Sequence, residues 1–305
     1  MFKKTFFIIF STIVFFVSGQ QLPQMSQYLL DDIIFNPSSL GTKNYDRIVL
    51  HHRSQWLGFD GAPVTQFISY NGSLKENMGI GGYIMNDITG PTRRLSFNLG
   101  YAYNFSITQK SKISLGLMAT LMQYGIDGNK VTLHEDFDPS IYEGYSDKSW
   151  KPDVSIGGLF YNENFYAGFS IMQLITSRVH LFKEEQFNAT IPLIQHFYVF
   201  SGYSMFLNEE FKLTPSLAMH GTLSSPLQFD IMFKGDYEEM VSAAITYRYK
   251  DAIILMLGTK IKDIFLISYS FDIIVSPLRK TNSGSHEIVL GIFLKKKNKG
   301  QKSLI

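Results

Sequence analysis

Histidine is the residue type in this sequence best suited to metal binding or proton transfer, because cysteine is absent. A histidine metal site needs further histidines or cysteines at short, regular spacings. None of the seven histidines has such a partner. The G-x-S-x-G, P-loop and dinucleotide-binding motifs are also missing. We therefore expect no enzyme activity, no catalytic residue, no metal site and no cofactor.

One acidic segment offers oxygen ligands. The carboxylates in the segment 134–138, His-Glu-Asp-Phe-Asp, have the chemistry that Ca²⁺ prefers. The alternative is an ordinary acidic surface loop, and the prediction of no metal follows that alternative. The formal net charge is +2, which gives no reason to expect a nucleic-acid partner.

The stretch from Arg53 to Pro63, RSQWLGFDGAP, joins the first predicted strand to the second. Side chains alternate along a strand, so Arg53 and Gln55 share one face while Trp56 falls on the other with Leu50. A tryptophan just before a turn is typical of the interfacial aromatic residues of a membrane barrel, although a buried core tryptophan in a soluble hairpin is the alternative. The turn itself contains Gly58, Asp60, Gly61 and Pro63, which suit a tight change of direction.

Four segments follow from composition along the chain. Residues 1–19 resemble a signal peptide, with two lysines, an apolar run and small residues before a cleavage site near Gln20. Residues 20–44 are polar and interrupted by proline, which indicates a lead-in or a plug for a barrel lumen. Residues 45–295 form the predicted barrel, and residues 296–305 form a basic, solvated tail.

The barrel prediction comes from alternation of side-chain type. Between residues 95 and 108, large apolar residues such as Leu99 alternate with small or polar ones such as Asn98. Strands of a soluble sandwich are usually shorter, at about 5–6 residues, whereas membrane strands need about 9–11. The sequence therefore favours a transmembrane antiparallel barrel, all-β in class, with Leu99 facing lipid and Asn98 facing the lumen. A secreted, soluble β protein is the alternative.

About fourteen runs of this kind occur, an even number that suits a bacterial outer-membrane barrel. Tight turns are expected near residues 75–76, 109–110, 162–163, 208–209 and 236–237, with long links over 128–151 and 174–191. Short turns face the periplasm in such barrels if both termini lie there.

Barrel closure brings the first strand beside the last. The first would run outward and reach Arg53, while the last would begin with Ser285, His286 and Glu287. Arg53 and Glu287 both fall on the polar face, which predicts a charge-assisted pair between them. The alternative is that both side chains are separately solvated in a wet lumen.

Several motifs in order along the chain resemble the PorP/SprF family of outer-membrane proteins, associated with the type IX secretion system of Bacteroidetes. The R-S-Q-W stretch and the later S-H-E element, Ser285 to Glu287, are the more specific ones. Others are Gln27-Tyr28, Asn36-Pro37 with Gly41, Gly79-Ile80-Gly81 with Asn86-Asp87, Tyr101-Ala102-Tyr103 and Tyr269-Ser270-Phe271-Asp272. Ser38-Ser39 departs from the family, which usually has alanine after N-P.

The resemblance implies a fourteen-stranded barrel similar in shape to fatty-acid channels, and a role in protein transport or gliding motility. Implied partners are components of the secretion machinery, a secreted adhesin with a C-terminal sorting domain, and outer-membrane lipid. A passive outer-membrane channel for hydrophobic solutes is the alternative function, because the fold alone permits it. The motif residues taken as interaction candidates are Asn36, Pro37, Arg53, Gln55, Trp56, Asp60, Pro63, His286 and Glu287.

Overall fold

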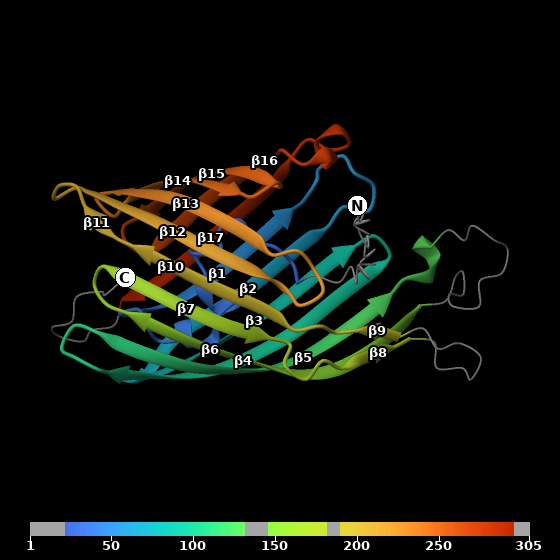
Figure 1. The fold of residues 1–305 in the computed structure, drawn as a ribbon, viewed down its shortest axis with the longest axis horizontal. Helices are drawn as coiled ribbons and strands as arrows, with labels where there is room; N and C mark the ends of the chain where they lie inside the picture. Colours follow the sequence, from blue (N-terminus) through green and yellow to red (C-terminus); the bar gives the residue numbers. More distant parts are fainter. Residues whose placement is uncertain (1–21, 132–145, 182–189, 296–305) are drawn as a thin grey trace, which may run out of the picture.

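A closed antiparallel barrel makes up most of the molecule (Figure 1). The computed structural model describes residues 22–131, 146–181 and 190–295. Strand β1 (Tyr45–Ser54) pairs with β17 (Ser285–Lys295), and β10 (His196–Tyr203) pairs with β12 (Phe211–Thr222), which closes the ring. The two-residue β11 (Met205–Phe206) continues β10, so the barrel has fourteen strands, as the sequence predicted.

The other barrel strands follow one another along the chain, each paired with its neighbours. They are β2 (Val64–Lys75), β3 (Met78–Thr89), β4 (Thr92–Ser106), β5 (Lys112–Ile126), β6 (Asp147–Tyr161), β7 (Phe165–Met172), β12 (Phe211–Thr222), β13 (Gln228–Tyr237), β14 (Val241–Arg248), β15 (Ala252–Ile261) and β16 (Phe265–Ile274).

Alternation along the strands sets the two faces of the wall. Leu99 is 68% exposed on the outside of β4, whereas Asn98 is 8% exposed and points inward. The same period of two runs through β1, where exposed Ile48, Leu50 and His52 alternate with buried Val49 and His51. The outer face is therefore apolar and the inner face largely polar or small, as in a membrane barrel.

The two ends of the barrel differ in the length of their connections. The short-turn rim carries the turns 76–77, 107–111, 162–164, 207–210, 238–240 and 262–264. The long-loop rim carries 55–63, the links from β5 to β6 and from β7 to β10, and 275–284, besides short turns at 90–91, 223–227 and 249–251. The long links contain η3 (Gly128–Lys130), η4 (Pro277–Lys280) and the hairpin of β8 (Arg178–His180) and β9 (Thr190–Pro192), seen at the right in Figure 1.

Several predicted boundaries are wrong. Lys75 still belongs to β2, and the barrel strand after the second long link begins only at His196. Asp236 and Tyr237 belong to β13, and the tight turn follows them at Glu238 and Glu239, whose φ angles of 48° and 55° are left-handed. Strand β6 begins at Asp147 rather than near residue 152, because its pairing with β5 extends to the long-loop rim.

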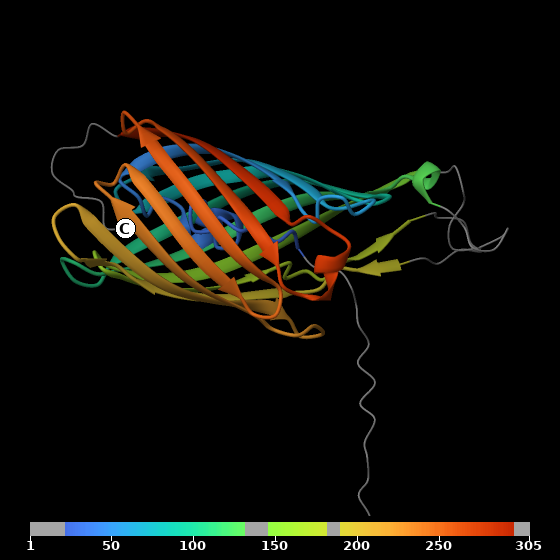
Figure 2. The same ribbon diagram turned by 90° about the horizontal axis from the view of Figure 1, so that it is seen from above.

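Residues 22–44, here called the inner segment, run inside the barrel before β1 begins (Figure 2). At the long-loop rim the Leu22 N–H donates to Nε2 of His196 at the start of β10. At the short-turn rim Gly41 contacts Gly79 at the start of β3. The inner segment therefore crosses the lumen from the long-loop rim to the short-turn rim before the first strand begins.

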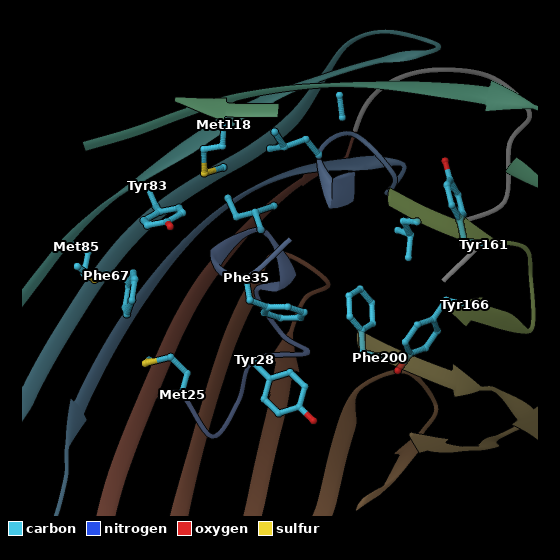
Figure 3. Packing of buried hydrophobic residues seen from close by; sticks show 14 of the residues in the cluster. Met25, Tyr28, Phe35, Phe67, Tyr83, Met85, Met118, Tyr161, Tyr166 and Phe200 are labelled. Carbon is cyan, nitrogen blue, oxygen red and sulfur yellow. The ribbon is translucent and has the colours of Figure 1, made fainter. Parts of the chain in front are cut away.

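The core lies between the inner segment and the barrel wall (Figure 3). Phe35 contacts Tyr28 and Phe200 edge-on, with ring centroids 5.4 and 5.2 Å apart. The inner segment itself folds into two single turns, η1 (Asp32–Ile34) and η2 (Pro37–Ser39). No helix in the described ranges is long and apolar enough to cross a bilayer.

Candidate functional site

Arg53 is, with Arg248, among the largest fully buried side chains in the described part of the chain, and it lies on the lumen face of β1. It is the direct register partner of Glu287 on β17, and its Nη1 lies 3.4 Å from Oε2 of that carboxylate. Its Nη2 donates to Oδ2 of Asp272 at 2.7 Å, and its Nη1 also donates to Oγ of Ser26 at 2.7 Å. The expected pair is therefore present, but it is shared with a second carboxylate and with the inner segment.

Glu287 holds the inner segment through the backbone. Its carboxylate accepts the N–H groups of Ser26 at 2.7 Å and Gln27 at 3.2 Å. The Gln27 side-chain amide donates in turn to the Glu287 carbonyl at 3.0 Å. Charge-assisted bonds of this kind are stronger than neutral ones, and Glu287 is fully buried, so the contact fixes the position of the segment.

His51 and Arg47 extend the contact along β1. The His51 ring lies between Oδ2 of Asp31 and Oε1 of Glu287, at 3.5 Å from each. Arg47 pairs with Asp32 and donates to the Leu30 carbonyl at 2.9 Å. Nη2 of Arg47 also lies 3.6 Å from Oδ1 of Asp31, so this buried carboxylate faces two basic side chains of β1.

Arg248 on β14 also contacts the inner segment. It pairs with Asp230 on β13, and its Nη2 donates to the Met25 carbonyl at 3.2 Å. Strands β1, β13, β14, β16 and β17 thus hold residues 25–32 together. We call the barrel side chains involved the clamp network: Arg47, His51, Arg53, Asp230, Arg248, Asp272 and Glu287.

The opposite wall receives the inner segment through glycines. A Cβ on Gly79 would stand 2.1 Å from the Leu40 carbonyl oxygen, and one on Gly116 would stand 2.3 Å from the Pro37 carbonyl carbon. A Cβ on Gly157 would stand 2.0 Å from Oδ1 of Asn36. We call Gly79, Gly116 and Gly157 the glycine seat, because only glycine allows the backbone to approach this closely.

Asn36 and Pro37 shape the part of the inner segment that fits this seat. Oδ1 of Asn36 accepts the N–H of Ser38 at 3.0 Å and its hydroxyl at 2.6 Å, which caps η2. Pro37 occupies the first position of η2, where its fixed φ is favourable. Both motif residues therefore serve a buried local structure.

A cavity of about 1030 Å³, here called the rim cavity, opens between the inner segment and the long-loop rim. Gln55, Trp56 and Pro63 line it, and the Gln55 N–H donates to the Pro63 carbonyl at 2.9 Å. Its apolar lining includes Met25, Tyr28, Phe35, Phe67, Tyr83, Tyr198 and Phe200. Three of the residues predicted as interaction candidates therefore lie together at one end of the lumen.

Trp56 does not face lipid, so its interpretation as an interfacial residue is wrong. It stands two residues after the end of β1 and has a left-handed φ of 49°, so the strand alternation does not extend to it. Its ring packs against Ala252, Ile254 and Ile274 on the inner face.

The remaining predicted residues lie away from these sites. Asp60 is exposed in the loop 55–63. His286 faces outward, where Nδ1 lies 2.7 Å from the Tyr269 hydroxyl. The segment 134–138 falls outside the described residues, and within the described ones no group of three or more histidine or acidic residues is arranged for a metal.

Sequence reasoning missed most of the clamp network. Charged residues on the inward face of a predicted strand, such as Arg248 and Asp272, could have indicated buried ion pairs. The pattern of a single strand does not show which residue each of them pairs with. The contributing residues that were not taken as interaction candidates are Ser26, Asp31, Arg47, His51, Asp230, Arg248 and Asp272, although Asp272 ends one of the family motifs.

Comparisons with known proteins agree with this architecture. A Pseudomonas aeruginosa FadL homologue has a TM-score of 0.50 at 9% identity, covering 85% of this chain and 92% of that one. The Pseudomonas putida toluene transporter TodX has a TM-score of 0.46 at 10% identity, covering 89% and 94%. The first likeness shows the fold alone, that of an outer-membrane barrel. No curated protein matches the sequence.

A family model gives the decisive comparison. The model of the type IX secretion system membrane protein PorP/SprF matches residues 17–292, which include the whole inner segment and nearly all of the barrel. The chain therefore belongs to the PorP/SprF family of type IX secretion system membrane proteins and is an outer-membrane β-barrel.

Proposed function

We propose that this protein is a docking component of the type IX secretion system, anchoring a secreted surface adhesin of the gliding type or the periplasmic ring. Family membership supports a place in the secretion machinery. We favour docking over transport because the inner segment occupies the lumen of the barrel.

The inner segment is the observation that carries the proposal. Its residues Ile33, Asn36 and Leu40 are fully buried between the clamp network and the glycine seat. A conduit for a secreted protein needs a free lumen, whereas an anchor needs a rigid wall. We infer that residues 22–44 act as a plug and that partners bind the outside or the rims of the barrel.

The two rims suit different partners. If the short turns face the periplasm, as is usual in bacterial barrels, the ring would meet the short-turn rim and an adhesin the long-loop rim. The turn residue Asn208 represents the first rim, and Asn282 next to η4 represents the second.

Site-specific photo-crosslinking in cells tests this proposal. A photoreactive residue at Asn208 should capture a ring component, or one at Asn282 should capture an adhesin. The same residue at lipid-facing Leu99 is the control and should capture neither. Absence of both products, with adhesins normally displayed on cells that lack the protein, contradicts docking.

The rim cavity favours a second candidate, a passive channel for hydrophobic solutes. Its volume of about 1030 Å³ and aromatic lining fit an apolar small molecule. Uptake of a radiolabelled hydrophobic solute by cells that lack the protein separates the two. A channel predicts slower uptake with normal adhesin display, and docking predicts the reverse.

A further inference from the structure

A row of polar side chains crosses the outer face of the barrel near the long-loop rim. His52, Gln66 and Asn86 are direct register partners on β1, β2 and β3. Nδ1 of His52 lies 3.4 Å from the Gln66 amide nitrogen, and Asn86 donates to the Gln66 amide oxygen at 3.3 Å. Nε of Arg93 on β4 donates to Oδ1 of Asn86 at 2.8 Å. We call these four residues the polar row.

The polar row is unusual for an outward face. Across the barrel, the outward side chains nearest the same rim are Phe229 on β13 and Tyr247 on β14, and Tyr249 follows in the turn after β14. On β1 the outward apolar stretch contains only Ile48 and Leu50, between Asp46 and His52. Polar groups that face lipid are costly unless they are hydrogen-bonded. The bonds within the row use only part of its donors and acceptors, so the remaining ones call for a polar contact.

An apolar groove of about 770 Å³ adjoins the polar row on the same strands. The groove begins at the next outward-facing residue along each strand, which is Ile68 after Gln66 on β2 and Ile84 before Asn86 on β3. Two small outward residues, Gly82 and Ala119, hollow it out. The other outward side chains that line the groove are Ile48, Tyr70, Ile80, Phe97, Leu99 and Leu121. Strands β1 to β5 lie side by side there (Figure 1).

We propose that the polar row and the groove form one binding site for a membrane lipid with a phosphorylated sugar headgroup. The groove takes an acyl chain, since its walls are apolar and it spans the outward face of β1 to β5. The amides of Gln66 and Asn86 and the ring of His52 bind sugar hydroxyls.

Arg93 binds the phosphate. Its guanidinium is exposed and, among the residues that the structure describes, no carboxylate lies within ion-pair distance of it. Arg94, its neighbour on the inward face, differs because it pairs with Asp87 at 2.8 Å. A planar guanidinium with a free edge is suited to bidentate phosphate binding.

Binding of purified lipid A to the delipidated protein in detergent, measured by native mass spectrometry, tests the site. Arg93→Gln should weaken binding about tenfold, the usual effect of losing a charge-assisted hydrogen bond. Ala119→Phe fills the groove and should also weaken binding about tenfold, since it excludes about two methylene groups of the acyl chain.

Matched variants elsewhere on the barrel give the controls. Arg279→Gln lies on η4 at the same rim, and Ala243→Phe lies on the outward face of β14. Both should bind lipid A like the wild type. The proposal is overturned if the controls lose as much affinity as the site variants, or if phosphatidylglycerol, which lacks the sugar, binds as tightly as lipid A.

Discussion

Arg53 and Glu287 face each other across the seam where the first strand of the barrel meets the last, and both are completely removed from solvent. Glu287 also accepts the backbone N–H groups of Ser26 and Gln27. One ion pair therefore joins barrel closure to the position of the inner segment. The barrel is filled while this segment stays against the wall, and it would be open if the segment left the lumen.

Removing either partner of this pair should destabilise the barrel strongly. A buried charge that loses its partner costs about 3–5 kcal/mol. Arg53→Ala and Glu287→Ala should each lower the free energy of unfolding in detergent by that order. The double variant should lose less than the sum, because the two groups interact directly. Arg279→Ala on exposed η4 is the control with no expected change; strict additivity of the two buried losses would remove the pair as a stabilising contact.

The glycine seat should be sensitive to a single methyl group. Gly116→Ala places a Cβ against the Pro37 backbone and should displace the inner segment. The protein has no cysteine, so a single cysteine can serve as the reporter. Ser39→Cys suits this use, because the native hydroxyl has no hydrogen-bond partner among the described residues, and its rate of maleimide labelling reports displacement. Labelling should be slow in the otherwise wild-type barrel and fast with Gly116→Ala.

Gly258→Ala is the matched control for this experiment. Gly258 also faces inward, but the nearest atoms to its added Cβ belong to Ser268, at 3.0 Å, and to the Ile267 carbonyl, at 3.5 Å, and none of them to the inner segment. Equal labelling rates in the Gly116 and Gly258 variants would show that the seat does not hold the segment.

The outward face of β4 should tolerate no charge. Leu99→Arg places a guanidinium in the apolar band and should cost roughly 2–4 kcal/mol of folding free energy in bilayers. Leu223→Arg, at a position 87% exposed on the turn after β12, makes the same substitution outside the strands and should cost little. Refolding yields into lipid vesicles measure the difference, and equal yields would mean that Leu99 does not lie in the membrane.

The inner segment should begin on the cell surface if long loops face outward. A cysteine replacing Gln24, which lines the rim cavity, should react with a membrane-impermeant maleimide on whole cells. A cysteine replacing Asn208 on the short-turn rim should react only after permeabilisation. The opposite labelling pattern would invert the orientation of the barrel.

Alternation along single strands was enough to predict the barrel, its strand number and the faces of Leu99 and Asn98, since strand periodicity is a local property. The Arg53–Glu287 pair was also predictable, because closure brings the ends of the chain together. The shared role of Asp272, His51 and Asp31 was not, since it depends on where residues 22–44 lie inside the lumen. Trp56 was misplaced because one left-handed residue ends the alternation on which its assignment depended.

Ion conductance of the mature chain in planar bilayers most directly tests whether the inner segment closes the lumen. The wild-type protein should insert without steady conductance, since residues 25–41 lie between the clamp network and the glycine seat. Glu287→Ala, which releases Ser26 and Gln27, should open the lumen and conduct. Steady conductance of the wild-type barrel, unchanged by Glu287→Ala, would contradict a filled lumen and with it the interpretation of the barrel as an anchor.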